Sequence, residues 1–222
     1  MTGLDVADVV QVTWLTLRIA LAAVAVGAFI GVPLGAWLAA RPRPSATALA
    51  HTLLMALYAL PPVVAGLVTY LLLSRAGPLG ALGLLFTPTA IVIAESLMAV
   101  PLVAGLTMAA MLEVPPEVRE AVRAQVGSIS WEARVLAREA RWGIAGALAV
   151  AFGRALAEVA AALLAGGNIQ GHTRTLGTAI LQEVTQGDHA EALLLAAVLL
   201  TLALLTMLAI ARLRRLDVEG IA

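Results

Sequence analysis

Residues 117–141, EVREAVRAQVGSISWEARVLAREAR, carry nine of the 28 formal charges in this 222-residue chain. The stretch is rich in residues that favour helix, and long apolar runs lie on both sides of it. A charged helical segment between two apolar runs lies in water rather than in the bilayer, where a soluble partner can bind it. The stretch therefore predicts a membrane protein with an exposed segment on which another protein can act.

The composition of the whole chain also points to the bilayer. Hydrophobic residues make up 61% of the chain and charged residues only 13%, with a mean hydropathy of +0.97. A soluble domain has about 25% charged residues. The formal net charge is zero, so no basic field indicates nucleic-acid binding. Cysteine is absent, which removes disulfides and cysteine-based metal sites, and we expect no bound metal.

Lysine is absent as well: all 14 basic residues other than histidine are arginine. A Walker P-loop needs its lysine to reach the β- and γ-phosphates of a nucleotide. We therefore expect no nucleotide site and no cofactor in this chain, so that any ATP and its magnesium bind a partner chain. The sequence contains neither H-E-x-x-H nor G-x-S-x-G, and we expect it not to be an enzyme.

Five apolar runs are long enough to span a membrane, since a helix that crosses about 30 Å of hydrocarbon needs roughly 20 apolar residues. They predict an all-α polytopic membrane protein that forms a single domain over residues 1–222. The charged stretch then lies in a loop at about residues 113–142. The predicted spans cover residues 13–40, 49–74, 87–112, 143–165 and 190–211.

The arginines predict which loops face the cytoplasm. Ten of them lie in the segments that follow the first, third and fifth spans, whereas Arg75 and Arg174 lie in the other connections. We therefore expect the N-terminus outside, the C-terminus in the cytoplasm, and the charged loop on the cytoplasmic face. The lipid bilayer would be that of a cytoplasmic membrane.

Local signals divide the charged loop into two helices. Pro115-Pro116 can start the first helix, Gly127 can end it, and Ser128 or Ser130 can cap the second. Two interpretations of the first helix remain open. It docks into a cleft on an ATPase, or it lies on the lipid headgroups as an interfacial helix.

Charged residues within the spans need partners. Arg154 and Glu158 are four residues apart on the fourth span, so they share a face. An unpaired charge in hydrocarbon costs from roughly 3 kcal/mol upward. The two residues should therefore pair, or face the protein interior or water. We expect an intramembrane ion pair, which either braces the bundle or is remade when the protein changes conformation. Glu95 is similarly placed in the third span, and the sequence does not name its partner.

Pro61-Pro62 lies in the middle of the second span. Proline within a helix frees backbone carbonyls, and broken helices are tolerated in membranes where the backbone lines a cavity or is buried in protein. The pair therefore predicts a kink. The kink either lies near a gate or is purely structural.

Gly166-Gly167-Asn168 ends the fourth span on the outer face. Glycines permit a helix-ending turn, which alone would explain them. Backbone N–H groups and an asparagine amide also suit an anion path, because they donate hydrogen bonds without a fixed charge. Thr173 and Arg174 add donors nearby, so direct contact with a substrate is the second interpretation.

The cytoplasmic loop contains a motif that resembles one of binding-protein-dependent importer permeases, E-A-A-x-x-x-G. Here Glu120-Ala121-Val122 precedes Gly127 with four residues between them instead of three. The I-x-L-P that usually follows is absent. The resemblance implies that the ATPase contacts lie among Glu117 and these four residues, without saying which of them makes the contact.

Further motifs, in the same order along nearly the whole chain, resemble the permeases of oxyanion importers. They are FGR at 152–154, EV at 158–159, GGNI at 166–169, TR at 173–174 and TAI at 178–180. The runs ALPPVVAGL at 59–67, LLLSR at 71–75 and LLFTPTA at 84–90 look most like the tungstate branch. Ala160 and Gly177 depart from the residues that are common in the family.

The resemblance implies the permease subunit of a prokaryotic ABC importer for tungstate, located in the inner membrane. The implied assembly holds a permease homodimer, two ATPase chains and an extracytoplasmic oxyanion-binding protein. The oxyanion would cross along the dimer axis near Pro61, Pro62, Gly167 and Asn168. Molybdate or sulfate is the nearest alternative substrate. An ATP-independent channel or ion-coupled carrier, working through the charged residues of its spans, is a different class, and a scaffold without transport is a third.

Overall fold

The computed structural model describes residues 5–41, 44–125 and 127–219, and every regular element in these ranges is a helix. Three helical segments are long and apolar enough to cross a membrane, namely Val6–Ala39, Pro88–Leu112 and His189–Arg212. Two further spans are helix pairs joined by bends of 80° and 62°. The predicted all-α architecture is confirmed, and the number of spans reaches five when each bent pair counts as one.

The first span is continuous but contains one π-helical turn. In chain order the described helices are α1 (Val6–Val26), η1 (Gly27–Gly31, π), α2 (Val32–Ala39), α3 (Pro44–Tyr58), α4 (Pro62–Leu73), η2 (Gly80–Leu82, 3-10), α5 (Pro88–Leu112), α6 (Pro116–Gln125), α7 (Ile129–Glu139), α8 (Arg141–Leu156), α9 (Ala160–Gly166), α10 (Leu176–Gln186) and α11 (His189–Glu219).

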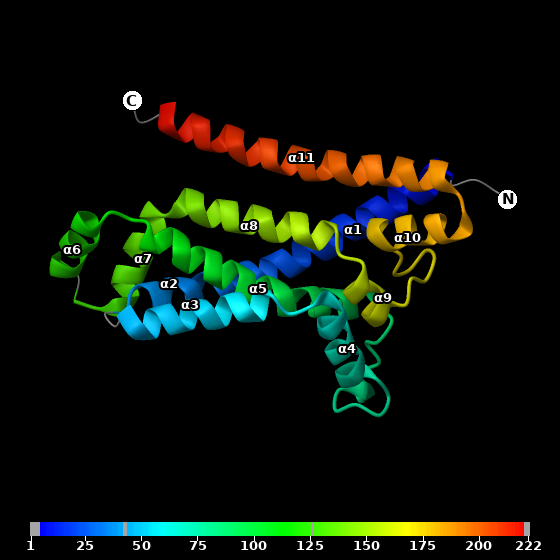
Figure 1. Cartoon of the computed structure of the whole chain (residues 1–222), viewed down its shortest axis with the longest axis horizontal. Coiled ribbons are helices and arrows are strands. Elements are labelled where there is room, and N and C mark those ends of the chain that lie inside the picture. The colour runs from blue at the N-terminus through cyan, green and yellow to red at the C-terminus, as the bar shows by residue number, and fades with distance from the viewer. Residues whose placement is uncertain (1–4, 42–43, 126, 220–222) are drawn as a thin grey trace.

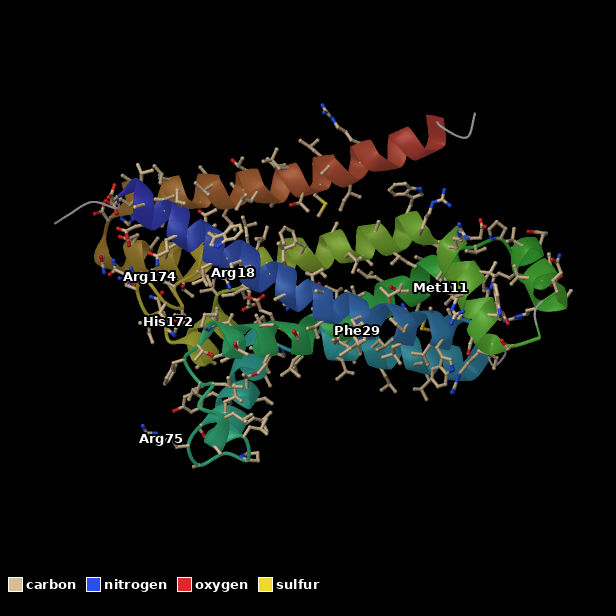
Figure 2. All side chains as sticks on the ribbon, turned by 180° about the vertical axis from the view of Figure 1, so that it is seen from behind. Arg18, Phe29, Arg75, Met111, His172 and Arg174 are labelled. Carbon is tan, nitrogen blue, oxygen red and sulfur yellow. The ribbon has the colours of Figure 1, made fainter. Side chains whose placement is uncertain are left out.

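Figure 1 shows α1, α5, α8 and α11 running along the long axis of the molecule. The short helices α6 and α7 lie at one end, and α9 and α10 lie at the other. The helix α4 projects sideways from the bundle near α9, and Figure 2 places Arg75 at the far tip of this projection. The start of α1 and the end of α11 lie toward opposite ends of the long axis.

The helix α5 forms the centre of the bundle. It begins where the sequence predicts, because the side chain of Thr87 accepts a hydrogen bond from the backbone N–H of Ala90 and Pro88 takes the first helical position. Within its most apolar stretch 67% of the residues are buried, against 6% for α11. It contacts α1, α2, α3, α4, α8 and α9. Since its apolar residues surround the helix on all sides, α5 suits a fully enclosed position.

Two glycines let the first span approach α5 very closely. A Cβ atom on Gly31 would lie 2.8 Å from the carbonyl oxygen of Val100. A Cβ atom on Gly35 would overlap the carbonyl oxygen of Ala104 and lie 3.0 Å from Cβ of Thr107. In both places the obstacle includes backbone, which cannot move aside as a side-chain end can. Close packing of the first span on α5 therefore depends on the absence of side chains here.

The second and fourth spans are bent, although the sequence predicts each as one run. The break in the second span follows from proline: Pro61 has φ −59° and ψ 134°, outside the helical region, and Pro62 starts α4. The predicted kink is thus present, with a bend of 80°. The two bent spans meet, since a Cβ atom on Gly66 of α4 would lie 2.8 Å from Cα of Ala161 in α9.

Candidate functional site

The charged loop forms two helices at one end of the bundle, as predicted. Pro116 starts α6, and Ser128 caps α7 by accepting a hydrogen bond from the backbone N–H of Trp131 at 3.3 Å. No described residue of α6 is buried. We predicted that five residues of this loop contact an ATPase. One of them points inward, and the other four are exposed. Val122 packs against the core cluster that contains Leu136, whereas the exposed ones are Glu117, Glu120, Ala121 and Gly127.

Two polar contacts hold this pair of helices together and against the bundle. Arg123 on α6 donates a hydrogen bond to Glu132 on α7 at 2.7 Å, in an ion pair whose glutamate side chain is 9% exposed. Arg119 reaches the carbonyl oxygen of Ala39, the last residue of α2, at 3.5 Å. The helix α7 also packs against α2, α5 and α8. A displacement of α6 would therefore act on several spans at once.

The predicted ion pair between Arg154 and Glu158 is absent from the described structure. The helix α8 ends at Leu156, so the spacing of four residues no longer places the two side chains on one face. Glu158 instead accepts a hydrogen bond from the backbone N–H of Ala161 at 3.1 Å and caps α9. The prediction was wrong for this conformation because it assumed an unbroken helix.

The side chain of Arg154 has other, weaker contacts. Its Nη2 atom lies 3.7 Å from Sδ of Met98, and its guanidinium carbon lies 5.1 Å from the ring centroid of Tyr58. A cation over an aromatic face is attracted by the ring. Sequence reasoning missed both partners, although Tyr58 directly precedes the ALPP run and Met98 follows Glu95 by three residues.

At the opposite end the turn after α9 has the geometry of a helix cap. Gly167 has φ 75° and Asn168 has φ 50°, both in the left-handed region. The hydroxyl of Thr173 donates to the carbonyl oxygen of Gly166 at 2.6 Å and accepts from the N–H of Ile169 at 2.9 Å. Gly166 and Thr173 therefore hold the turn in shape, as the structural interpretation predicts.

Asn168 and Arg174 keep polar atoms unused in this turn. The amide nitrogen of Asn168 donates to Gln182 at 2.7 Å, but its Oδ1 atom has no hydrogen-bond partner in the described part of the chain. The Nε atom of Arg174 likewise has none there. Figure 2 shows Arg174 and His172 at the end of the molecule away from Met111. Contact between these residues and a substrate therefore stays a prediction.

The two predicted parts of the pathway lie on neighbouring elements. Pro61 is exposed and Pro62 half-buried at the start of α4, and α4 packs along α9, the helix that ends at Gly166. A Cβ atom on Gly167 would lie 2.8 Å from the ring of Phe86, which itself has φ 62°. No signal in the sequence marked Phe86 as a neighbour of the turn at Gly167.

A comparison of the sequence with known protein families decides the class. Residues 31–217 match the family described as the inner membrane component of binding-protein-dependent transport systems. The chain belongs to this family. Membership of this family, together with at least three described helices that are long and apolar enough to cross a bilayer, makes it a multi-pass membrane protein.

Curated relatives of this inner membrane component extend over most of the chain. A probable anion ABC transporter permease from Haloferax volcanii is 37% identical to this chain. The match covers 90% of this chain and 88% of the relative. The tungstate uptake permease TupB of Peptoclostridium acidaminophilum is 34% identical, with 87% of this chain and 84% of the relative covered. The sulfate permease CysW of Synechocystis is 31% identical, with coverages of 81% and 70%.

The fold of this inner membrane component also matches a solved transporter. A chain of the inward-facing methionine ABC transporter MetNI superposes with a TM-score of 0.71, at 22% identity, over 93% of this chain and 94% of the other. The match shows that the two chains share their overall fold.

Three carboxylates of this inner membrane component gather around the end of α10, and one of them, Glu191, lies in the first turn of the α11 span. One oxygen each of Glu183, Asp188 and Glu191 lies within 4.8 Å of the others. Burial raises the pKa of the Glu183 carboxyl most, and the charges of Glu191 and Asp188 raise it further, while Arg174 lowers it. At neutral pH the ionised carboxylate of Glu183 therefore lowers the stability of the folded chain.

We expect the Glu183→Gln variant to unfold at a higher temperature near pH 7.5, by about 2 °C. Between the ordinary glutamate pKa of about 4.3 and the raised pKa, the folded chain binds more protons than the unfolded chain, so stability falls as pH rises. When the pH is lowered from about 7.5 to about 5, the unfolding temperature of the wild type should rise through Glu183. The variant should lack this part of the rise. Thermal unfolding at both pH values measures this, with Glu117→Gln on exposed α6 as the control. Equal shifts in both variants would contradict the role of burial.

Proposed function

We propose that this chain is the permease subunit of an ABC importer that moves tungstate into the cytoplasm. ATP, with its magnesium, is hydrolysed on a separate ATPase chain, and this chain is not itself an enzyme. Family membership and the relatives named as ABC transporter permeases support the proposal. The absence of lysine supports the placement of the nucleotide on the partner, because this chain has no P-loop lysine.

The observation that carries the proposal is the position of α6. Val122 packs on the core, whereas Glu117, Glu120 and Ala121 are exposed beside one larger apolar side chain, Val118. A helix that lies on lipid headgroups would turn an apolar face outward. A polar helix held by Arg123 and Glu132 at the end of the bundle fits a docking site for a soluble ATPase better.

The choice of tungstate rests on two relatives, the TupB permeases of Peptoclostridium acidaminophilum and Campylobacter jejuni, at 34% and 35% identity. Permeases named for sulfate and molybdenum match at 31%, so molybdate or sulfate is the alternative substrate. The turn after α9 supports an anionic substrate in general through Arg174, whose Nε donor has no hydrogen-bond partner among the described residues.

The proposed assembly is a permease homodimer with an extracytoplasmic binding protein and two ATPase chains. The projecting helix α4 supports the homodimer, since its surface is apolar and extends away from the bundle (Figure 1). The oxyanion would cross between two copies, near the α3–α4 bend and the turn after α9. The orientation that we propose keeps the N-terminus outside and α6 in the cytoplasm. The exposed apolar residues of α4 are Val63, Val64, Leu67, Val68, Tyr70, Leu71 and Leu72.

ATPase activity in nanodiscs tests this proposal directly. The permease is co-expressed with its candidate ATPase, and the cognate binding protein is added after loading with tungstate, molybdate or sulfate in turn. Stimulation by tungstate alone is the expected result. Equal stimulation by molybdate would reduce the proposal to an oxyanion importer. Failure to form a stable complex with the ATPase would contradict it.

Liposomes that contain the purified chain alone separate the proposal from the other functional classes. We expect no movement of oxyanion into these liposomes without an ATPase. Uptake by the chain alone would establish a channel or an ion-coupled carrier. Absence of uptake even in the complete assembly would instead favour a scaffold.

A further inference from the structure

A buried cluster of charges lies where the two bent spans meet. Glu95 on α5, Arg154 near the end of α8 and Glu158 in the break before α9 line one cavity of about 10 Å³. The two glutamates are only 4% and 7% exposed. A cavity of this size has room for about one water molecule. Two buried carboxylates and a half-buried guanidinium therefore line a space with almost no solvent, where the carboxylates need partners from the protein.

The two carboxylates differ in what they bind. Glu158 accepts the hydrogen bond from the backbone of Ala161 and is held at the start of α9. The Oε2 atom of Glu95 has no hydrogen-bond partner within the described ranges. A buried polar atom without a partner loses its hydration without compensation, which makes such atoms rare in native proteins. Glu95, rather than Glu158, is therefore the carboxylate that still needs a partner.

The arginine of the cluster also lacks a strong partner. Its Nε atom has no hydrogen bond in the described part of the chain, and its Nη2 atom touches only the thioether of Met98. Met98 follows Glu95 by three residues on α5, so the two lie on the same face, about 4.5 Å apart along the helix axis. The guanidinium thus contacts a residue about one helical turn from Glu95 and lines the same cavity as Glu95.

We propose that Arg154 is a positioning residue of the transport cycle, which contacts Tyr58 and Met98 in this state and forms an ion pair with Glu95 in the opposite state. Tyr58 is the last residue of α3, next to the α3–α4 bend, and Arg154 lies two residues before α8 ends. Movement of the guanidinium from Tyr58 to Glu95 would link both bends to α5, which contacts all the helices involved. This inference rests on the proposed function, because it requires a transporter that alternates between two states.

Two glutamine variants provide the first test, in the nanodisc complex with ATPase and loaded binding protein. Glu95→Gln removes the charge that Arg154 would pair with. Glu158→Gln removes the other charge of the cavity but keeps a side-chain oxygen that can cap α9. We expect Glu95→Gln to lower the stimulated ATPase rate about tenfold, and Glu158→Gln to stay within about twofold of the wild type. If Glu158→Gln lowers the stimulated ATPase rate as much as Glu95→Gln or more, while the wild-type complex is stimulated normally, the inference about Arg154 is overturned. The proposed function would then still stand.

A double-mutant cycle tests whether the two residues act on each other. If they pair, the Arg154→Gln variant and the variant that combines it with Glu95→Gln should have similar stimulated rates, because either change already removes the pair. Effects that multiply would overturn the proposed pairing. Thermal unfolding of each variant in detergent checks that a lost rate is not a lost fold.

A cysteine reporter separates positioning from a purely structural role. The chain has no cysteine of its own, so Ala59→Cys, at an exposed position in the α3–α4 break, gives a single reactive site. We expect its alkylation by a water-soluble maleimide to change about tenfold when a non-hydrolysable ATP analogue binds the complex, and this change to shrink in the Glu95→Gln background. An unchanged response in that background would overturn the inference. Absence of any response to substrate or nucleotide in the complex that carries Ala59→Cys alone would overturn the proposed function as well.

Discussion

The Gly35→Ala variant is expected to lose about 3 kcal/mol of stability, which is large for the addition of one methyl group. The new Cβ atom would overlap the carbonyl oxygen of Ala104, so α2 would have to move away from α5 along its length. That movement also disturbs Ala39, whose carbonyl oxygen accepts a hydrogen bond from Arg119 of α6. Thermal unfolding of the purified permease in detergent, together with the yield of monodisperse protein, measures the loss.

Gly146→Ala is the matched control for this experiment. Gly146 lies within α8, and a Cβ atom there would meet nothing within 4 Å. Since alanine favours helix over glycine by about 0.5–1 kcal/mol, this variant should be neutral or slightly more stable. Equal losses in the two variants would show that the close contact between α2 and α5 does not limit stability.

The second large effect is expected on assembly rather than on folding. Ala121→Arg places a long charged side chain on the exposed surface of α6, where we propose that the ATPase binds. We expect the amount of ATPase that copurifies to fall about 30-fold, as for a strongly contributing interface position. The unfolding temperature of the permease alone should change little, because Ala121 is exposed.

Two further variants give this experiment its controls. Ala190→Arg makes the same substitution at an exposed position on the first turn of α11, at the other end of the molecule, and should leave copurification unchanged. Val122→Arg should destabilise the permease itself, because Val122 packs against the core around Leu136. Copurification that survives Ala121→Arg would place the ATPase contact elsewhere.

Features that arise from local signals were predictable from the sequence. Thr87 and Pro88 start α5 because capping and proline geometry act within a few residues, and Ser128 starts α7 for the same reason. The number of spans followed from apolar length alone. The kink at Pro61 was predictable in position, whereas its 80° angle was not, since the angle depends on the packing of α4 against α9.

The break between α8 and α9 carries no such local signal. Residues 157–159 read Ala-Glu-Val, without glycine or proline, and the apolar run continues past them. The break becomes apparent only when Glu158 is seen to cap α9. For this reason the sequence predicted an ion pair with Arg154 that the described structure lacks. The partners of Arg154, namely Met98 and Tyr58, come from helices 56 and 96 residues away, which spacing arguments do not reach.

The enclosure of α5 has a consequence for how motion in this protein can be observed. Amide hydrogens of α5 can exchange with solvent only after the helices around it open. We therefore expect α5 to show the slowest deuterium uptake in the chain. Such a helix provides a fixed reference frame, so that spectroscopic probes placed on α4, α6 and α9 report their own displacement when measured against it.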